Sequence, residues 1–358
     1  MAATPLDGPE VGVPWGDPPP GARWVLAVDI GGTNLKVGMV PVDGGEPRGL
    51  RVEPTRVEEG AEAVTERVVR MARAARDEVL TAEGAASEPG AVAGVGIGSP
   101  GPLDRAAGVV VSTPNLRWRN HPIRDGVAGP LGLSSALDND ANCAVLGDWW
   151  RGAGRGSRVL LGFTLGTGVG GGVVLDGRIH HGVADVAGEL GHATIDYQGR
   201  MCGCGNRGCL EAYCSGSNIA ARAVEELAGG ARSRIRDLVD GDLSRVTAAR
   251  VAEAAVDGDP FAVDFLARTA HLLAVGVANA MNMLNPDRVV FAGGVTGAGE
   301  HLFGPLREEV RRRAFPSAYR ACSLLPAELP DTAGVIGAAA MFLQARQSGE
   351  ARDPGMAG

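Results

Sequence analysis

The stretch Trp24-Val-Leu-Ala-Val-Asp-Ile-Gly-Gly-Thr-Asn-Leu-Lys36 sets an apolar run directly before a pair of glycines. A short apolar run bounded by turn residues is typical of a buried strand. A second such run continues from about residue 36 to residue 42, so the stretch predicts a hairpin with a glycine-rich bend. Strands predicted at 158–165 and 171–176 flank Gly166-Thr-Gly-Val-Gly-Gly-Gly172 in the same way, which suggests two related halves.

Helices surround these two hairpins in the sequence. Apolar residues recur at intervals of three and four over 64–79 and 263–284, which predicts a helix at about 61–82 and a long helix that Asn285-Pro286 ends. Further strands are expected at 91–97, 134–138 and 288–292, with helices at about 138–150 and 333–343. Strands that alternate with helices predict an α/β fold.

The length of the chain predicts two domains, because 358 residues exceed what one hydrophobic core usually serves. Residues 1–22 are rich in proline and glycine, and we expect them to form a disordered leader. A small α/β domain is expected at 23–136, joined by the helix at about 333–346, and a large α/β domain at 137–332. A cleft between the two domains is the natural place for a substrate.

The charge of the chain disfavours several classes of partner. Its formal net charge is -8 at pH 7, which is the wrong sign for nucleic acid or an anionic membrane. No uncharged apolar run approaches the ~18 to 20 residues that span a bilayer, and residues 1–22 lack the basic start and apolar core of a signal peptide. We therefore expect a cytoplasmic protein that acts on a small molecule.

Three glycine-rich turns follow predicted strands and could bind phosphate through their backbone N–H groups. They are Gly31, Gly32 and Thr33; Gly166, Thr167 and Gly168; and Gly293 with Gly294. Taken singly, each could be a tight turn whose glycines adopt a positive φ, but three together favour a phosphate site. Asp29 precedes the first turn, where its carboxylate could hold a metal that bridges phosphates or could be an ordinary turn aspartate.

Two carboxylates at the start of the helix predicted at 138–150, Asp138 and Asp140, have two possible roles. Phosphoryl transfer to an alcohol needs a group that accepts the hydroxyl proton, and a carboxylate can do so. Aspartate is also a preferred helix N-cap, and spacing alone favours capping.

A cysteine cluster predicts a metal site. Cys202, Cys204 and Cys209 have the spacing C-x-C-x₄-C, and His192 lies ten residues upstream, so a tetrahedral zinc site is sterically plausible. Free thiols are the alternative, but three so close together would be prone to oxidation. With four protein ligands the zinc would be structural, because no position is left for a water. Cys143 and Cys214 lie outside the pattern and are expected to be small buried side chains.

Five motifs together resemble the ROK family (repressor, open reading frame, kinase). They are Asp29-Ile-Gly-Gly-Thr-Asn-Leu-Lys36, Asn139-Asp-Ala-Asn142, Thr164-Leu-Gly-Thr-Gly-Val-Gly-Gly-Gly172, Glu189-Leu-Gly-His192 and Cys202-Gly-Cys-Gly-Asn-Arg-Gly-Cys-Leu-Glu211. Their order and spacing match the sugar kinases of that family over about residues 23–345, and the chain is most similar to its bacterial glucokinase branch. The segment Thr113-Pro-Asn-Leu-Arg-Trp118 resembles that branch too.

The resemblance implies an actin-like ATPase fold, with two α/β domains and ATP in the cleft between them. It implies ATP-dependent phosphorylation of glucose at its 6-hydroxyl, with Asp140 as general base, which reverses the preference for capping. The implied sugar contacts are Asn115, Asn139, Asp140, Glu189, His192 and Glu211. The implied contacts to ATP and Mg²⁺ are Asp29, Gly31, Gly32, Thr33, Asn34, Lys36, Thr164, Gly166, Thr167, Gly168, Gly293 and Gly294. Structural Zn²⁺ is implied at His192, Cys202, Cys204 and Cys209.

Several alternatives stay open at this point. N-acetylmannosamine, N-acetylglucosamine or fructose could replace glucose as the substrate. The repressors of the family add a DNA-binding module of roughly 60 to 80 residues before the first strand, where this sequence has 22 residues, so a sugar-sensing regulator is the weaker expectation. A zinc-stabilised sugar-binding protein without catalysis is a further alternative. We also expect a homo-oligomer, either a dimer or a tetramer.

Overall fold

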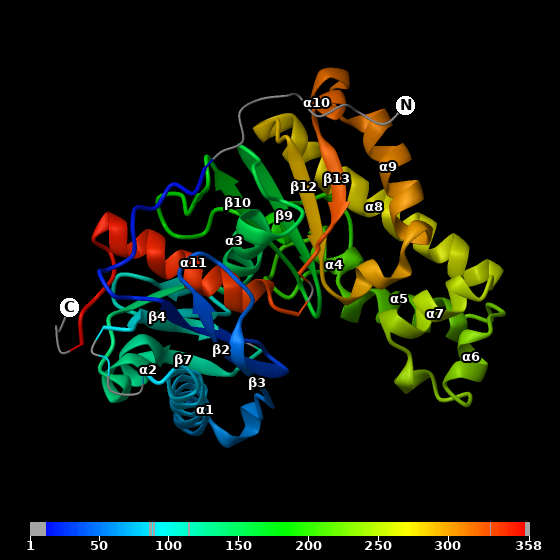
Figure 1. Ribbon diagram of the computed structural model, residues 1–358. Helices are drawn as coiled ribbons and strands as arrows, with labels where there is room; N and C mark the ends of the chain where they lie inside the picture. The colour runs from blue at the N-terminus through cyan, green and yellow to red at the C-terminus, as the bar shows by residue number, and fades with distance from the viewer. Residues whose placement is uncertain (1–11, 86–87, 89, 114, 330, 355–358) are drawn as a thin grey trace. The chain divides into compact units, whose positions relative to one another are not determined.

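The computed structural model describes residues 12–85, 88, 90–113, 115–329 and 331–354 (Figure 1). These residues form two compact units. Of the described residues, the first unit takes 12–158, 173–187 and 328–354, and the second takes 159–172 and 188–327. The expected boundary at residue 136 falls inside the strand Ser135–Asn139, whereas this division keeps residues 135–151 in the first unit.

A sheet of mixed direction forms the centre of the first unit, in the order β3-β2-β1-β4-β8. Its strands are β1 (Trp24–Ile30), β2 (Asn34–Pro41), β3 (Arg48–Pro54), β4 (Val92–Ser99) and β8 (Ser135–Asn139). β1 runs antiparallel to β2 and parallel to β4, and β4 runs parallel to β8. The predicted glycine-bend hairpin is therefore confirmed as β1 and β2.

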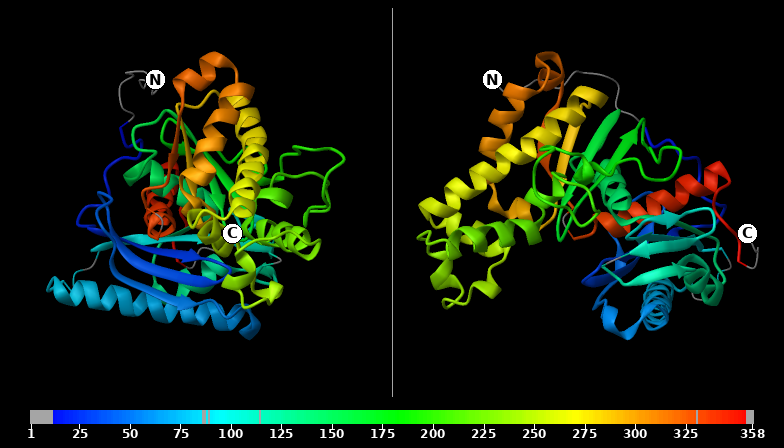
Figure 2. Two further views of the ribbon diagram at one scale, coloured as in Figure 1. Left: turned by 90° about the vertical axis from the view of Figure 1, so that its right-hand side faces the viewer. Right: turned by 180° about the vertical axis from the view of Figure 1, so that it is seen from behind.

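Helices cover both faces of this sheet. They are α1 (Ala61–Ala82), α2 (Ile123–Leu131), α3 (Asp140–Arg151) and α11 (Ala333–Ser348). α1 contacts β2 and β3 and packs on α2, while α11 contacts β1 and β4 and packs on α3. Figure 1 and Figure 2 show α11 on the opposite face of the sheet from α1. A small three-stranded sheet in the same unit contains β5 (Leu103–Asp104), β6 (Val109–Thr113) and β7 (Trp118–His121).

Glycines set how closely α11 packs against its neighbours. A Cβ on Gly96 of β4 would lie 1.9 Å from the carbonyl oxygen of Ala338. A Cβ on Gly337 of α11 would lie 1.6 Å from the carbonyl oxygen of Cys143 in α3. Both positions exclude any side chain, so α11 fits directly on the sheet and on the helix that begins at Asp140.

The second sheet of five strands has the order β11-β10-β9-β12-β13. Its strands are β9 (Val159–Leu165), β10 (Val169–Leu175), β11 (Arg178–Ile179), β12 (Arg288–Ala292) and β13 (Ser323–Pro326). β12 runs parallel to β9 and to β13. The α-helices of the second unit are α4 (Glu211–Cys214), α5 (Gly216–Ala228), α6 (Ile235–Leu238), α7 (Ala248–Val256), α8 (Pro260–Leu284), α9 (Glu300–Arg313) and α10 (Pro316–Ala321). Short 3₁₀ helices are Val57–Glu59 in the first unit and Leu190–His192, Leu243–Arg245 and Gly294–Ala298 in the second.

The long helix α8 has clear signals at both ends. The Asp259 side chain caps its first turn by accepting a hydrogen bond from the backbone N–H of Ala262, and Pro260 begins it. Asn285 ends it in the left-handed conformation, as the Asn285-Pro286 pair predicts. Among the described residues, α8 alone is long and apolar enough to cross a membrane by length and composition. With 56% of its apolar window buried, α8 has the character of a core helix.

The expected leader contains an ordered contact. Residues 1–11 lie outside the described residues, but Trp15 is only 8% exposed. Its ring lies 5.9 Å from that of Trp149 and 5.3 Å from that of Trp150, between ring centroids. Composition misses this contact, because one large aromatic side chain can hold a proline-rich segment against a helix.

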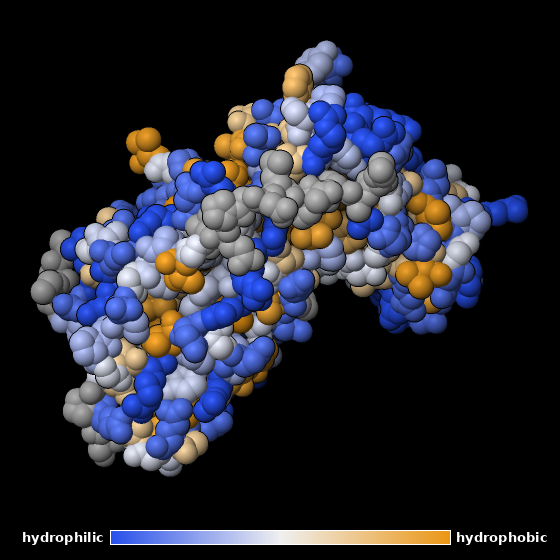
Figure 3. All heavy atoms as spheres, turned by 45° about the horizontal axis from the view of Figure 1, so that its top comes forward, coloured by the Kyte–Doolittle hydropathy of each residue, from blue (hydrophilic) through white to orange (hydrophobic). Residues whose placement is uncertain are grey.

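The face of the molecule shown in Figure 3 has apolar side chains scattered among hydrophilic ones.

Candidate active site and metal centre

The turn between β8 and α3 presents Asn139 and Asp140 at the start of a helix. Asn139 is the N-cap, because its Oδ1 accepts hydrogen bonds from the backbone N–H groups of Ala141 at 2.9 Å and Asn142 at 3.2 Å. Asp140 is the first residue of α3 and is partly buried. Capping therefore falls to Asn139, and the Asp140 carboxylate lies where the helix N-terminus favours a negative charge.

Asp138 cannot serve as the base. Its carboxylate is fully buried and accepts hydrogen bonds from the backbone of Asn139 at 2.7 Å and from His181 Nε2 at 2.6 Å. Burial alone would raise its pKa, but the hydrogen bond and charge of His181, with the nearby Arg105 guanidinium, bring the pKa of Asp138 below its usual value. The carboxylate therefore stays ionised and occupied. No pattern in the sequence connects His181 or Arg105 to this position.

The first glycine loop joins β1 to β2 and lies beside Asp29. The backbone N–H of Gly31 donates to the carbonyl of Asn34 at 3.0 Å, which closes the turn. Neither Gly31 nor Gly32 has a positive φ, so the turn does not need glycine for its backbone shape. A Cβ on Gly32 would lie 3.6 Å from the Cβ of Asn115, so this loop and the predicted sugar segment are neighbours.

Asp29 is paired with Lys36 in the register of the β1–β2 hairpin. Burial raises the pKa of Asp29 to about 6, and the charge of Lys36 opposes that rise. Lys36 also donates a hydrogen bond from Nζ to the carbonyl of Asp331 at 2.8 Å. A carboxylate of this kind, at the end of a strand and beside an open glycine loop, can hold a hard divalent cation.

Asp29, Asp138 and Asp140 gather at one edge of the first sheet. Gly98 of β4 pairs with Asp29 on one side and with Asp138 on the other. Cys143, fully buried behind this edge, has a pKa well above its usual value because of burial and because of these three carboxylates. The expectation that Cys143 is a small buried side chain is confirmed.

The second glycine loop joins β9 to β10 in the second unit, with Thr164 near the end of β9. The carbonyl of Gly166 accepts from the backbone N–H of Gly216 at 2.7 Å, and the carbonyl of Thr167 accepts from Ser217 Oγ at 2.6 Å. Gly166 and Gly168 lack a positive φ, and a Cβ on Gly166 would meet nothing within 4 Å. The loop is therefore held by carbonyls on one side and is open at Gly166.

The third loop, Gly293-Gly294, combines two different roles. Gly293 has φ 96°, and a Cβ there would lie 2.4 Å from the carbonyl oxygen of Leu165, so this glycine is required by the fold. A Cβ on Gly294 would meet nothing within 4 Å. Among the six predicted loop glycines, Gly293 alone has a positive φ; the other five are Gly31, Gly32, Gly166, Gly168 and Gly294.

His192 and three cysteines form a compact cluster in the second unit. The ligand atoms of His192, Cys202, Cys204 and Cys209 all lie within 4.8 Å of one another. Cys202 Sγ is 3.7 Å from His192 Nδ1, and Cys204 Sγ is 3.7 Å from Cys209 Sγ. Zinc–sulfur bonds of about 2.3 Å in a tetrahedron place two ligand atoms about 3.8 Å apart. The donor set and its spacing therefore fit zinc.

The two ring nitrogens of His192 face different groups. Nδ1 faces the cysteines, whereas Nε2 lies 3.9 Å from the nearer carboxylate oxygen of Glu189. Glu211 also lies beside the cluster, with Oε1 3.7 Å from Cys202 Sγ, and its Oε2 accepts a hydrogen bond from the backbone N–H of Val169 at 2.9 Å. Three predicted sugar contacts, Glu189, His192 and Glu211, are thus close to one another.

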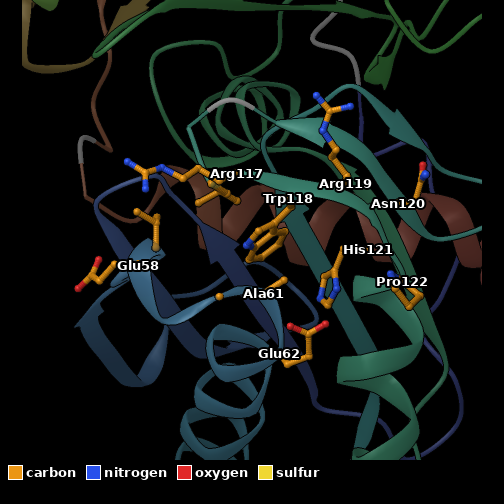
Figure 4. Close-up of a pocket in the computed structure, with 12 residues that line it drawn as sticks. Glu58, Ala61, Glu62, Arg117, Trp118, Arg119, Asn120, His121 and Pro122 are labelled. Atoms are coloured by element: carbon orange, nitrogen blue, oxygen red, sulfur yellow. The ribbon is translucent and has the colours of Figure 1, made fainter.

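A pocket of about 390 Å³ lies in the first unit, next in sequence to Asn115 (Figure 4). Its wall includes Trp118, Arg117 and Asn120, and the last two have a positive φ of 60° and 46°. His121 Nε2 shares a hydrogen bond of 2.8 Å with Thr65 Oγ1 at its edge. The residues that line this pocket include none of the predicted site residues.

The chain is similar to known sugar kinases over most of its length. It is 38% identical to a glucokinase of Thermotoga maritima over 89% of this chain and 96% of that one. It is 36% identical to a glucokinase of Halalkalibacterium halodurans, over 92% of this chain and 97% of that one. A ROK family glucokinase from Streptomyces griseus, solved with glucose and AMPPNP, superposes with a TM-score of 0.73 at 32% identity, over 88% of this chain and 98% of that one. The family profile, described as ROK family, matches residues 25–345. The chain belongs to the ROK family, and its fold is the two-domain α/β fold of the actin-like ATPases.

Proposed function

We propose that this protein is a glucokinase, which transfers the γ-phosphoryl group of ATP to the 6-hydroxyl of glucose. Its similarity to glucokinases over most of the chain supports this function. The observation that carries it is the turn at the start of α3, where Asn139 takes the cap and Asp140 stands at the helix N-terminus. A carboxylate placed in this way can accept a proton from an alcohol.

In the proposed reaction, Asp140 accepts the proton of the 6-hydroxyl as that oxygen forms its bond to the γ-phosphorus. The bond from phosphorus to the bridging oxygen breaks, and ADP leaves. Asp29 is proposed to hold Mg²⁺, directly or through water, and this cation would neutralise charge on the phosphates. The backbone of Gly31 and the open backbone of Gly32, Gly166 and Gly294 are proposed to approach the nucleotide, with Lys36 held beside the first loop.

Glucose is proposed to be bound by Asn115, Asn139, Glu189, His192 and Glu211. Asn139 uses Oδ1 for its helix cap, so its Nδ2 group is the part that donates to a sugar oxygen. Glu211 uses Oε2 for the backbone of Val169, so Oε1, which lies 3.7 Å from Cys202 Sγ, is the oxygen proposed to accept from a sugar hydroxyl. His192 would bind zinc through Nδ1 and present Nε2 to the sugar beside Glu189.

Zinc is proposed to be structural, because the four protein ligands fill a tetrahedron. Its chemistry would be to stabilise the loop over residues 192–209 and to fix the ring of His192. We further propose that the protein acts in the cytoplasm, as a homo-oligomer. Glucose 6-phosphate is a substrate for sugar breakdown, so a role in glycolysis follows from the proposed activity.

A screen of purified protein with ATP and Mg²⁺ tests the function. Glucose, fructose, N-acetylglucosamine and N-acetylmannosamine are supplied in turn, and ADP release is followed. Glucose is expected to give the highest kcat/KM. A preference for an N-acetylated sugar would assign the chain to another kinase of the family. Sugar binding without ADP release from any of these sugars would instead favour a regulator or a sugar-binding protein.

A further inference from the structure

A buried carboxylate lies directly behind the proposed catalytic turn. Asp138 precedes Asn139 and Asp140, and its own side chain has no exposed surface. Its Oδ1 accepts hydrogen bonds from the backbone N–H of Asn139 at 2.7 Å and from Asn142 Nδ2 at 3.0 Å. One oxygen of Asp138 therefore holds both ends of the Asn139-Asp-Ala-Asn142 turn.

The other oxygen of Asp138 has one hydrogen-bond donor, His181, and one nearby positive charge, Arg105, both from distant parts of the first unit. His181, which follows β11, places Nε2 2.6 Å from Oδ2. Arg105, which follows β5, places Nε 3.5 Å from the same oxygen, which is an ion pair without a hydrogen bond. A carboxylate can only accept, so His181 Nε2 must carry the proton of this hydrogen bond.

The Arg105 guanidinium is itself fixed by further carboxylates. Its two terminal nitrogens lie 3.1 Å from Asp185 Oδ1 and 3.0 Å from Glu350 Oε2. The Arg105 side chain is 16% exposed, while that of Glu350 is 57% exposed. Arg105 therefore reaches Asp138 from a well-held position rather than as a mobile surface side chain.

Removing a donor from this arrangement has a definite physical consequence. A buried carboxylate that loses a charge-assisted hydrogen bond keeps its cost of desolvation, so it must move toward another donor or toward water. Asp138 can move only together with the backbone N–H of Asn139 and the amide of Asn142, to which it is bound. The turn that carries Asn139 and Asp140 would then shift as well.

We propose that His181 and Arg105 are positioning residues for phosphoryl transfer, which act through Asp138 on the turn that carries Asn139 and Asp140. This proposal rests on the proposed kinase function. His181 contributes the shorter contact, so it is the sharper test. A misplacement of ~1 Å at a reacting group can cost on the order of 10²-fold in rate. We therefore expect about a 10- to 100-fold loss of kcat when the His181 donor is removed.

The test compares three variants. His181→Phe removes the donor and keeps the ring, while His181→Gln can restore a donor near Nε2 of the histidine. Val127→Ala, which shortens a fully buried side chain of α2 in the same unit, is the control for lost stability alone. We expect lower kcat and a raised KM for glucose in His181→Phe, an unchanged KM for ATP, and partial rescue in His181→Gln. Val127→Ala should lower Tm without lowering kcat.

A second measurement does not depend on activity. Hydrogen exchange of the Ala141 and Asn142 amides reports the cap that Asn139 makes. His181→Phe should speed this exchange relative to the rest of α3, while Val127→Ala should not. Unchanged exchange in His181→Phe, or wild-type kcat in an active preparation of it, would overturn the positioning role. A wild-type protein that phosphorylates no sugar would instead refute the kinase function, and the exchange result would still decide whether His181 holds the turn.

Discussion

The carboxylate of Glu211 accepts a hydrogen bond from the backbone N–H of Val169 at 2.9 Å. Glu211 closes the cysteine motif, and Val169 follows the second glycine loop, so two motifs share one contact between residues that are 42 positions apart in the sequence. A Cβ on Gly168 would lie 2.5 Å from the same carboxylate oxygen. A change in this loop can therefore disturb a proposed sugar contact as well as the proposed phosphate site.

Two valine substitutions separate these effects. Gly166→Val adds a side chain in open space and should raise KM for ATP about 10-fold or more, since a hydrogen bond to a charged group is worth ~1.5 kcal/mol or more. Its KM for glucose should change little. Gly168→Val should raise KM for both substrates, because its side chain meets Glu211. Steady-state kinetics measures both constants. An unchanged KM for ATP in Gly166→Val would remove this loop from phosphate binding.

Asp140→Asn should keep the fold and glucose binding while kcat falls on the order of 10² to 10⁴-fold, the usual range for losing a general base. The amide oxygen of asparagine can still accept from the backbone of Ala141, as Asp140 Oδ1 does at 2.9 Å. Turnover is followed by ADP release, and glucose binding by calorimetry. Turnover close to that of the wild type would show that another group takes the proton.

Two substitutions of Asn139 distinguish its cap from its sugar contact. Serine is as good an N-cap as asparagine but lacks the amide donor, so Asn139→Ser should raise KM for glucose with Tm nearly unchanged. Asn139→Ala should show the same rise and also lose about 1 kcal/mol of stability. Urea unfolding and kinetics provide the two readings. Equal KM for glucose in Asn139→Ser and wild type would exclude an Nδ2 contact to the sugar.

The purified protein should carry about one zinc per chain. Cys204→Ala should lose the metal and most glucose phosphorylation, because His192 would lose its fixed orientation. Cys322→Ala, at a cysteine outside the cluster, is the matched control and should keep both. Elemental analysis of protein prepared without chelator measures the metal content. Zinc-free wild-type protein would rule out the site, and a fully active Cys204→Ala would break the connection from zinc to the sugar.

Burial of Asp29 makes a prediction for pH. The pKa of Asp29 is about 6 in the folded protein and 3.8 when unperturbed. Between pH 3.8 and pH 6 the unfolded chain has therefore released this proton while the folded protein still holds it. The stability of the folded state falls as pH rises through this range. Asp29→Asn removes this penalty, so its gain in Tm over wild type should grow from pH 4 to pH 7, measured without added Mg²⁺. Asp77→Asn, at an exposed carboxylate of α1, should show no such growth. The same gain at both pH values would contradict a raised pKa for Asp29.

Asp29→Asn should also lose phosphorylation at every pH, because an amide holds Mg²⁺ poorly. In the wild type at limiting Mg²⁺, activity should decline as pH falls and Asp29 takes up its proton, and excess Mg²⁺ should move that decline to lower pH because the cation competes with the proton.

The parts of the fold that repeat a local pattern are the parts that the sequence predicts well. The apolar run before Gly31-Gly32 is the observed strand β1, and the apolar residues that recur every three or four positions up to Asn285 form the observed helix α8. Trp15 was not predicted to be ordered, because its partners Trp149 and Trp150 are more than 130 residues away in the chain. His181 and Arg105 were missed for the same reason, since only the folded chain brings them to Asp138.

The close crossing of Gly337 and Cys143 has a consequence for synthesis. Among the described residues, α11 comes last of the helices in sequence, yet it packs on α3, whose first residue is Asp140. While the chain grows on the ribosome, the sheet face that α11 covers stays exposed and the proposed catalytic turn lacks its support. The first unit can therefore fold fully only when α11 has emerged, and chains cut short before residue 333 would not phosphorylate a sugar.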